Sequence, residues 1–192
     1  MTDAKLLTQF NAGQTQAFNI LVKRWECPIY NFILRYIGDA DEARDLCQKT
    51  FIRAYRNLSK LREPDKFTAW IYQIALNTCK DETRRRSHLS FNTLQETDET
   101  TLPSTAPITY PDALAHQQSV RDLLNRALQT LPEEQRVVII MKEYQGLKFT
   151  EIADTLKTPV NTIKSRLYYG LSALKKTFDQ WHITEDMMRY EL

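Results

Sequence analysis

The sequence predicts an all-α protein of two small helical domains joined by a flexible linker. Apolar residues recur at three- and four-residue steps on both sides of the middle of the chain, as in amphipathic helices. Glycine is scarce, with 4 residues in 192, which disfavours sheets with many tight turns. The stretch between the two helical parts is acidic, rich in Ser, Thr and Pro, and without helical period, which favours a linker over a structured loop. We place a first domain at 1–88, the linker at 89–114, a second domain at 115–180 and a tail of unknown role at 181–192.

The first domain is predicted to begin with a long helix and a second helix packed beside it. One apolar stripe runs from Ala17 to Tyr36, and Gly38 is expected to end that helix, because glycine adopts the left-handed conformation at little cost. Asp39, followed three residues later by Glu42, is typical of a capping box at the start of the next helix. Six residues of this second helix are expected to face inward: Ala43, Cys47, Phe51, Ala54, Tyr55 and Leu58.

A third helix, from about Asp65 to Arg86, is expected to bury Phe67, Ile71, Ile74 and Ala75. Its other side carries residues spaced three or four apart, which we call the ridge: Trp70, Gln73, Asn77, Lys80 and Arg84. Arg85 and Arg86 are expected to extend it, and Tyr72 sits near its start. Cations neutralise phosphates, amides contact base edges and aromatic rings stack on unpaired bases, so the ridge indicates nucleic-acid binding. A solvated helix face beside a core tryptophan is the alternative.

The second domain is predicted to begin with a helix that buries Val120, Leu123, Leu124, Ala127 and Leu128. Pro132 suits the first position of the next helix, and Glu133 and Glu134 then lie near the positive end of its dipole. Val137, Val138, Ile140 and Met141 supply the apolar face of that helix, and Gly146 is expected to close it.

The next two helices are separated by a sharp break. Thr158 is expected to be an N-cap and Pro159 the first residue of the new helix, so the preceding helix should end at Leu156. The outer face of the new helix combines hydrogen-bonding groups, cations and aromatic rings: Asn161, Thr162, Lys164, Ser165, Arg166, Tyr168 and Tyr169. This pattern predicts a helix-turn-helix whose second helix enters the major groove. An ordinary helical hairpin with a solvated face is the alternative.

Charge and composition support nucleic-acid binding and argue against catalysis. Residues 14–88 carry 14 basic and 9 acidic side chains, and residues 115–180 carry 10 and 7, so both domains are basic. The 3 cysteines and 3 histidines are scattered, and no spacing resembles a metal site or a nucleophile with its base. We therefore expect no enzyme activity, no metal and no cofactor. The N-terminus does not resemble a signal peptide and no apolar run is long enough to span a membrane, so a cytoplasmic protein with its cysteines reduced is expected.

Five blocks of the sequence occur in the order and spacing of extracytoplasmic-function (ECF) sigma factors, which the chain resembles over about residues 10–176. These blocks are GQTQAFNILVKRW, DEARDLCQKTFIRAYRNL, FTAWIYQIALNTCKD, LPEEQRVVIIMKEYQGLKFTEIADTL and PVNTIKSRLYYG. The resemblance implies a subunit that binds core RNA polymerase and directs promoter-specific transcription initiation. The first domain would be region 2, which recognises and melts the −10 element, and the second would be region 4, which recognises the −35 element.

The resemblance also implies roles for individual residues. Region 2 would dock on the clamp helices of the polymerase β′ subunit through one block: Asp45, Leu46, Gln48 and Phe51. The loop at 57–66 would receive a base flipped out of the −10 element, Asn77 would help to read that base, and the rest of the ridge would follow the strand. The −35 element would be read by six residues on the outer face of the last helix: Asn161, Thr162, Lys164, Ser165, Arg166 and Tyr168.

Three positions depart from the family pattern. Lys49 replaces the usual Glu beside the docking block, a charge reversal that bears on the strength of the polymerase contact but not on its existence. Tyr169 and Leu171 stand where many members carry Arg, so we expect a lower affinity for phosphate or a changed base preference.

The expected partners are core polymerase through its β′ and β subunits, promoter DNA and an anti-sigma factor, without membrane insertion. A conventional helix-turn-helix regulator would explain the second domain equally well, but it leaves the ridge and the docking block without a role. An inactive decoy of the polymerase subunit is a further alternative.

Overall fold

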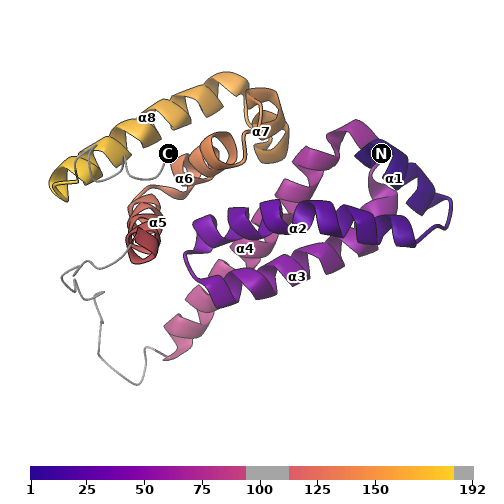
Figure 1. Ribbon diagram of the computed structural model, residues 1–192, viewed down its shortest axis with the longest axis horizontal. Coiled ribbons are helices and arrows are strands. Elements are labelled where there is room, and N and C mark those ends of the chain that lie inside the picture. The colour runs from indigo at the N-terminus through magenta and orange to yellow at the C-terminus, as the bar shows by residue number, and fades with distance from the viewer. Residues whose placement is uncertain (94–112, 184–192) are drawn as a thin grey trace.

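The computed structural model describes residues 1–93 and 113–183, and every regular element within these ranges is a helix. The first domain contains α1 (Asp3–Asn11), α2 (Gln16–Ile37), α3 (Ala40–Asn57) and α4 (Phe67–Thr93), with two 3₁₀ turns, η1 (Leu58–Lys60) and η2 (Pro64–Lys66), before α4. The second contains α5 (Ala113–Gln129), α6 (Glu133–Ile139), the π-helical turn η3 (Ile140–Tyr144), α7 (Phe149–Leu156) and α8 (Val160–Gln180) (Figure 1). The predicted all-α fold with two helical domains is confirmed.

The ends of the predicted linker are helical. α4 continues beyond Arg86 to Thr93, and α5 begins at Ala113, so both helices extend into the predicted range 89–114. The rest of that range lies outside the described residues, as does the tail beyond Ile183. Among the described residues, no helix has the length and hydropathy needed to cross a bilayer.

Local capping signals determine where α2 ends and α3 begins. Gly38 ends α2 with a left-handed backbone, at φ 87°, and its N–H donates to the Leu34 carbonyl. The Asp39 carboxylate then accepts a hydrogen bond from the backbone N–H of Glu42 at 2.8 Å. The helix end at Gly38 and the N-cap at Asp39 are confirmed, but the reciprocal half of the predicted capping box is absent, because the Glu42 carboxylate pairs with Arg86.

The two proline-based helix starts are shifted by one residue from their predicted positions. α8 begins at Val160, so Pro159 precedes the helix with an extended ψ of 142°. Thr158 does not cap α8, because its hydroxyl donates back to the Leu156 carbonyl at 3.0 Å. α7 ends at Leu156 as predicted, and Lys157 makes the turn in the left-handed conformation, at φ 50°. Pro132 precedes α6 in the same way.

Helix α1 was not predicted. Leu6 and Leu7 are buried where this short helix packs against α2. The Trp25 indole N–H donates to the Asp3 carboxylate at 3.1 Å, and Arg24 pairs with the same carboxylate. Trp25 is thereby fixed at the edge of the core, where its ring meets those of Phe67 and Tyr72 edge to face.

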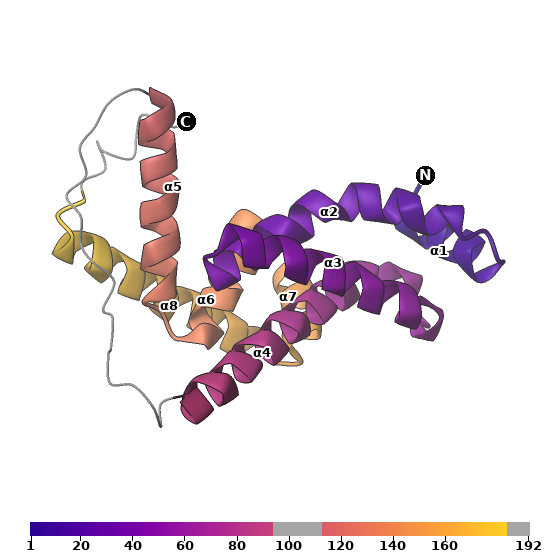
Figure 2. The same cartoon turned by 90° about the horizontal axis from the view of Figure 1, so that it is seen from below.

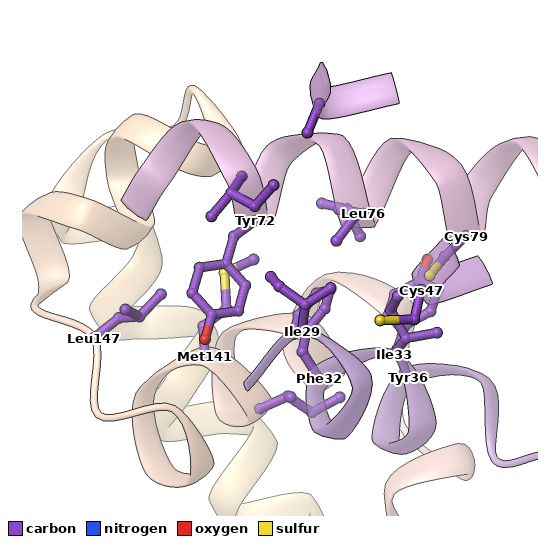
Figure 3. Close-up of a cluster of buried hydrophobic side chains, with 14 of the residues drawn as sticks. Ile29, Phe32, Ile33, Tyr36, Cys47, Tyr72, Leu76, Cys79, Met141 and Leu147 are labelled. Atoms are coloured by element: carbon purple, nitrogen blue, oxygen red, sulfur yellow. The ribbon is translucent and has the colours of Figure 1, made fainter. Parts of the chain in front are cut away.

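The core of the first domain continues into the second domain. Figure 3 shows Ile29, Phe32 and Tyr72 of the first domain grouped with Met141 and Leu147 of the second, all buried. α7 packs against α4, as Figure 2 also shows, and η3 packs against α2. In this arrangement the two domains share one apolar cluster.

Hydrogen bonds and an ion pair cross the same boundary, which we call the domain contact. The Tyr72 hydroxyl donates to Gln145 Oε1 at 2.8 Å, and the Thr155 hydroxyl donates to the Ala69 carbonyl at 3.3 Å. Lys80 Nζ lies 2.9 Å from a carboxylate oxygen of Glu133. Tyr72, interpreted as an aromatic stacking surface near the start of the ridge, is instead buried in the domain contact, so that interpretation is wrong. Tyr55, predicted to face inward on α3, is instead 46% exposed.

Candidate docking and nucleic-acid surfaces

A groove of about 700 Å³ opens between α2 and α3. Its lining combines apolar, charged and polar side chains: Val22, Lys23, Glu26, Cys27, Tyr30, Arg44, Cys47, Gln48, Phe51 and Ile52. Ile52 is 51% exposed there, although it is a large apolar residue. An apolar groove with charged edges is suited to receive an amphipathic helix of another protein.

The structure brings together half of the predicted docking block. Gln48 and Phe51 line the groove, whereas Asp45 is exposed on α3 outside it. Leu46 is buried, because it lies on the inner face of α3, one turn from the buried residues Ala43 and Thr50. Leu46 therefore supports the helix and does not line the groove.

Lys49 belongs to an ion cluster between α3 and α4. Its Nζ atom lies 3.5 Å from Glu82 Oε2, and Arg86 Nη1 lies 2.8 Å from Glu42 Oε2. The hydrogen bond from Arg85 holds the pKa of Glu82 below its ordinary value, whereas burial raises the pKa of Glu42. The charge of Lys49 is thus balanced within the domain and lies outside the groove lining. Arg85 and Arg86, expected to extend the ridge, pair with these acidic groups instead.

A pocket of about 290 Å³ lies where the loop after α3 meets the start of α4. It is lined by Lys60, Leu61, Arg62, Glu63, Lys66, Ala69, Trp70, Gln73 and Asp154. The half-buried Trp70 ring packs against Phe67, with centroids 5.8 Å apart, and its remaining surface faces the pocket. The pocket therefore offers an aromatic surface, an amide and cations in one place, a combination suited to an unpaired base and its phosphate.

The ridge is only partly assembled around this pocket. Trp70 and Gln73 line it, whereas Asn77 and Arg84 are exposed further along α4. Lys80 pairs with Glu133 of α6 and so faces the second domain. Burial alone would raise the pKa of Glu133, but hydrogen bonds from Lys80 and Tyr36 hold it below its ordinary value. The ion pair with Lys80 and the lowered pKa both indicate that the Glu133 carboxylate is charged in the domain contact.

Like Glu133, Asp154 of α7 is an acidic residue of the second domain that lies beside the first domain. Its carboxylate lies at the edge of the pocket that the loop residues Lys60, Arg62 and Lys66 make basic. Negative charge at this position repels a phosphate, so the pocket is less favourable for DNA while the domains are in contact.

Helix α8 is held by α6 and α7. Ile163 and Gly170 are buried on its inner face, and Asn161, Thr162, Lys164, Ser165 and Tyr168 are exposed on its outer part. Arg166 is different from the other predicted DNA contacts, because it lies 2.6 Å from Glu134 of α6 and its side chain is only 24% exposed. The structure therefore presents five of the six predicted −35 residues to solvent and turns the sixth toward α6.

The sequence did not predict which acidic residues of the second domain lie beside the candidate DNA-binding residues. Glu133 and Glu134 were interpreted only as charges near a helix dipole, and Asp154 was given no role. The role of Gly170 was also missed: a Cβ atom built there would lie 2.7 Å from Ile139 Cδ1. An isolated glycine within a helical pattern is the signal that could have identified this close approach of α8 to α6.

Within residues 1–93 and 113–183, no group of three or more His, Cys, Asp or Glu side chains could hold a metal ion. Of the three cysteines, Cys27 is exposed, and burial raises the pKa of Cys47 to about 11 and that of Cys79 to about 12. The two buried thiols are therefore weak nucleophiles at neutral pH.

Comparison with known families gives matches in both domains. Residues 21–89 match sigma-70 region 2, and residues 121–174 match sigma-70 region 4. The RNA polymerase sigma-H factor of Pseudomonas aeruginosa is 31% identical over 178 residues, which cover 91% of this chain and 92% of that protein. The ECF RNA polymerase sigma-E factor of Escherichia coli K12 is 30% identical over 178 residues, covering 91% of this chain and 93% of that protein.

Solved structures share the fold at lower identity. CnrH, solved in complex with the cytosolic domain of CnrY, matches with a TM-score of 0.69 and 22% identity, over 93% of this chain and 97% of CnrH. The sigma factor RpoE of Bartonella quintana, solved in complex with the anti-sigma factor NepR, matches with a TM-score of 0.65 and 20% identity, over 84% of this chain and 96% of RpoE.

Proposed function

The chain belongs to the ECF sigma factors of the sigma-70 family, and from this premise we propose how its surfaces divide the work of promoter recognition. As a sigma factor it binds core RNA polymerase and directs transcription initiation at promoters; it is not an enzyme. Because it acts on polymerase, we place it in the cytoplasm. The order of region 2 and region 4 along the chain is the single observation that carries this function.

We assign polymerase docking to the groove between α2 and α3. Gln48 and Phe51 line it, and the exposed Ile52 gives it apolar surface that a helix of the β′ subunit would cover. Lys49, whose charge is balanced by Glu82, does not weaken this contact in our proposal. The same groove is the surface that we assign to an anti-sigma factor, so the two partners would compete for it.

We assign the −10 element to the pocket beside Trp70 and to the ridge. Trp70 and Gln73 would hold a flipped base against the loop at 57–66, and the exposed Asn77 would contact an adjacent base edge. Lys80 and Arg84 would neutralise phosphates of the same strand. The outer face of α8 would read the −35 element, with Lys164 as the first cation within the helix.

Promoter binding then requires the two domains to separate. The −10 and −35 elements are about 25 base pairs apart, or about 85 Å along the duplex at about 34 Å per helical turn. α8, with its 21 residues, is only about 30 Å long at about 1.5 Å per residue. Lys80 of the ridge contacts Glu133 of α6, and α6 packs against α8, so in this arrangement the ridge and α8 lie too close together to reach both elements. We therefore interpret the arrangement with the domain contact as the form that precedes promoter binding.

A reconstituted transcription assay tests the function directly. Purified full-length protein is added to core RNA polymerase with a pool of genomic promoter fragments, and start sites are mapped. Promoter-specific transcripts that depend on the added protein are expected. Core binding without any promoter-specific start would contradict the function and favour the inactive decoy.

Single substitutions test the assignments of surfaces. Gln48→Ala should weaken core binding while leaving the melting temperature unchanged, and Gln180→Ala, an exposed glutamine on α8, is the matched control. Asn77→Ala should reduce discrimination at one base of the −10 element, whereas Arg84→Ala should weaken binding to all sequences alike. Equal loss on every sequence for both variants would rule out base reading by Asn77.

A further inference from the structure

Two adjacent tyrosines dominate the exposed face of α8. Tyr168 is 71% exposed and Tyr169 is 62% exposed, more than any other large hydrophobic side chain in the described residues. Their rings meet edge to face, with centroids 5.7 Å apart and planes at 72°. Each ring therefore stabilises the orientation of the other without being buried against the protein.

The polar groups around this pair are largely engaged elsewhere. Arg166 is tied to Glu134 at 2.6 Å and points toward α6. The Ser165 hydroxyl donates to the Asn161 carbonyl of its own helix at 3.0 Å. Lys164 is exposed and lies over the Phe149 ring, with Nζ 5.8 Å from its centroid. Because Arg166 and Ser165 already have partners, the aromatic pair is the largest surface that this part of α8 offers to a major groove.

The chemistry of the major groove indicates what such a surface contacts. Among the four bases, only thymine presents an apolar group there, its C5 methyl. A tyrosine ring is apolar on its faces and carries a hydroxyl at its tip, so it can cover a methyl group while the hydroxyl reaches a phosphate or water. A guanidinium at position 169 would instead favour the two acceptors of guanine.

We propose that Tyr168 and Tyr169 determine the −35 preference of this sigma factor by covering thymine methyl groups, and that Arg166 positions α8 through Glu134 without contacting a base. This inference rests on the proposed −35 role of α8. It predicts thymine at one or two neighbouring positions of the element, opposite the middle of the helix. It also predicts that the preference comes from van der Waals contact, since neither side chain forms a charged pair with a base.

The experiment uses the full-length protein with core polymerase and a duplex promoter library randomised over the −35 region. Enriched sequences should contain the predicted thymines. These duplexes are then synthesised with deoxyuridine at each thymine in turn, which removes only the methyl group. Loss of one covered methyl should weaken wild-type binding about fourfold, the factor that corresponds to burying one such group. Deoxyuridine in the spacer is the control and should have no effect.

Protein variants complete the test. Tyr168→Ala and Tyr169→Ala should each bind thymine and deoxyuridine equally at the position that the replaced ring covers, and Tyr168→Phe and Tyr169→Phe should keep the preference for the methyl group there. All four should melt like the wild type, because both rings are exposed. Glu134→Gln should reduce the affinity for all −35 sequences alike, as expected when a positioning contact is lost.

Three outcomes would overturn the inference. Wild-type binding that does not distinguish thymine from deoxyuridine excludes methyl contact. Alanine variants that lose core-polymerase binding instead of base preference would mean that the pair contacts protein. If no −35 sequence is enriched although −10-dependent transcription occurs, the proposed −35 role of α8 itself fails, which is distinguishable from the first two results.

Discussion

Replacing Gly170 by alanine tests how tightly α8 packs against α6. Gly170 is buried, and a Cβ atom there would lie 2.7 Å from Ile139 Cδ1 and 3.1 Å from Gln135 Cβ. Ile139 is itself buried, so its terminal methyl cannot move aside without displacing core neighbours. The Gly170→Ala variant must therefore shift α8 outward or force Ile139 into a poorer rotamer.

The expected magnitude follows from two opposing effects. Overpacking of a core contact costs about 1–3 kcal/mol, whereas alanine is favoured over glycine in a helix by about 1 kcal/mol. The net loss of unfolding free energy for Gly170→Ala should therefore be up to about 2 kcal/mol. Ile139→Val removes the Cδ1 atom and should cost about 0.5–1.5 kcal/mol in the wild type. The same change should cost less when it is made in the Gly170→Ala variant, because it relieves the clash with the added methyl group.

Urea unfolding of the wild type, both single variants and the double variant measures this coupling. We expect the double variant to be more stable than the sum of the two single losses predicts, by about 1 kcal/mol. The −35 affinity of Gly170→Ala should fall as well, since the displaced helix carries the face to which we assign −35 recognition. Additive losses, or a Gly170→Ala protein about 1 kcal/mol more stable than wild type, would refute the close approach.

Three other predictions concern the cysteines and the domain contact. A thiol reagent at pH 8 should label only Cys27 in the native protein, because burial raises the pKa values of Cys47 and Cys79. After denaturation all three cysteines should be labelled, and equal labelling rates for the three cysteines of the native protein would contradict this prediction. Tyr72→Phe removes a hydrogen bond across the domain contact and should weaken the contact by about 0.5–1.5 kcal/mol. Fluorophores on the two domains should then lie further apart on average, and an unchanged distance distribution would count against this role of Tyr72. The pKa of Glu133 is held below its ordinary value in the domain contact. The carboxylate therefore stabilises the contact fully at any pH above the ordinary pKa of a glutamate, and this stabilisation is lost as the pH falls through the lowered pKa. Glu133→Gln should flatten this acid dependence in the same fluorescence assay, and an unaltered pH profile would exclude the carboxylate as its source.

The features predicted correctly from sequence depend on short-range chemistry. Gly38 and Asp39 fix a helix end and a helix start within a few residues, and the structure has both. The apolar stripes of α2 and α3 also place most of the core correctly, because helical spacing alone decides which residues share a face. Tyr55 shows where this fails: it lies at the margin of the stripe, and its ring packs on Phe10 of the unpredicted helix α1 while remaining half exposed.

The features that the sequence did not predict depend on contacts between distant segments. Nothing near Lys80 indicates that Glu133, on the other side of the linker, is its partner. Arg166 matches a DNA-contacting position by motif, yet Glu134 engages it. Tyr72 was interpreted as a stacking surface near the start of the ridge, but its hydroxyl donates to Gln145 within the domain contact. Charge and spacing identify candidate binding residues, whereas tertiary structure decides which of them already have partners.

The contact between the domains makes the second domain a tethered competitor of promoter DNA. If Lys80 is bound either by Glu133 or by a phosphate, the apparent affinity for DNA is the intrinsic affinity multiplied by the fraction of molecules with separated domains. Stabilising the contact by a further increment of about 1.4 kcal/mol lowers this affinity tenfold. A protein that binds preferentially to the form with the domain contact weakens promoter binding by a certain factor. By thermodynamic reciprocity, promoter DNA weakens the binding of that protein by the same factor. An inhibitor of this sigma factor therefore has no need to touch a DNA-binding residue.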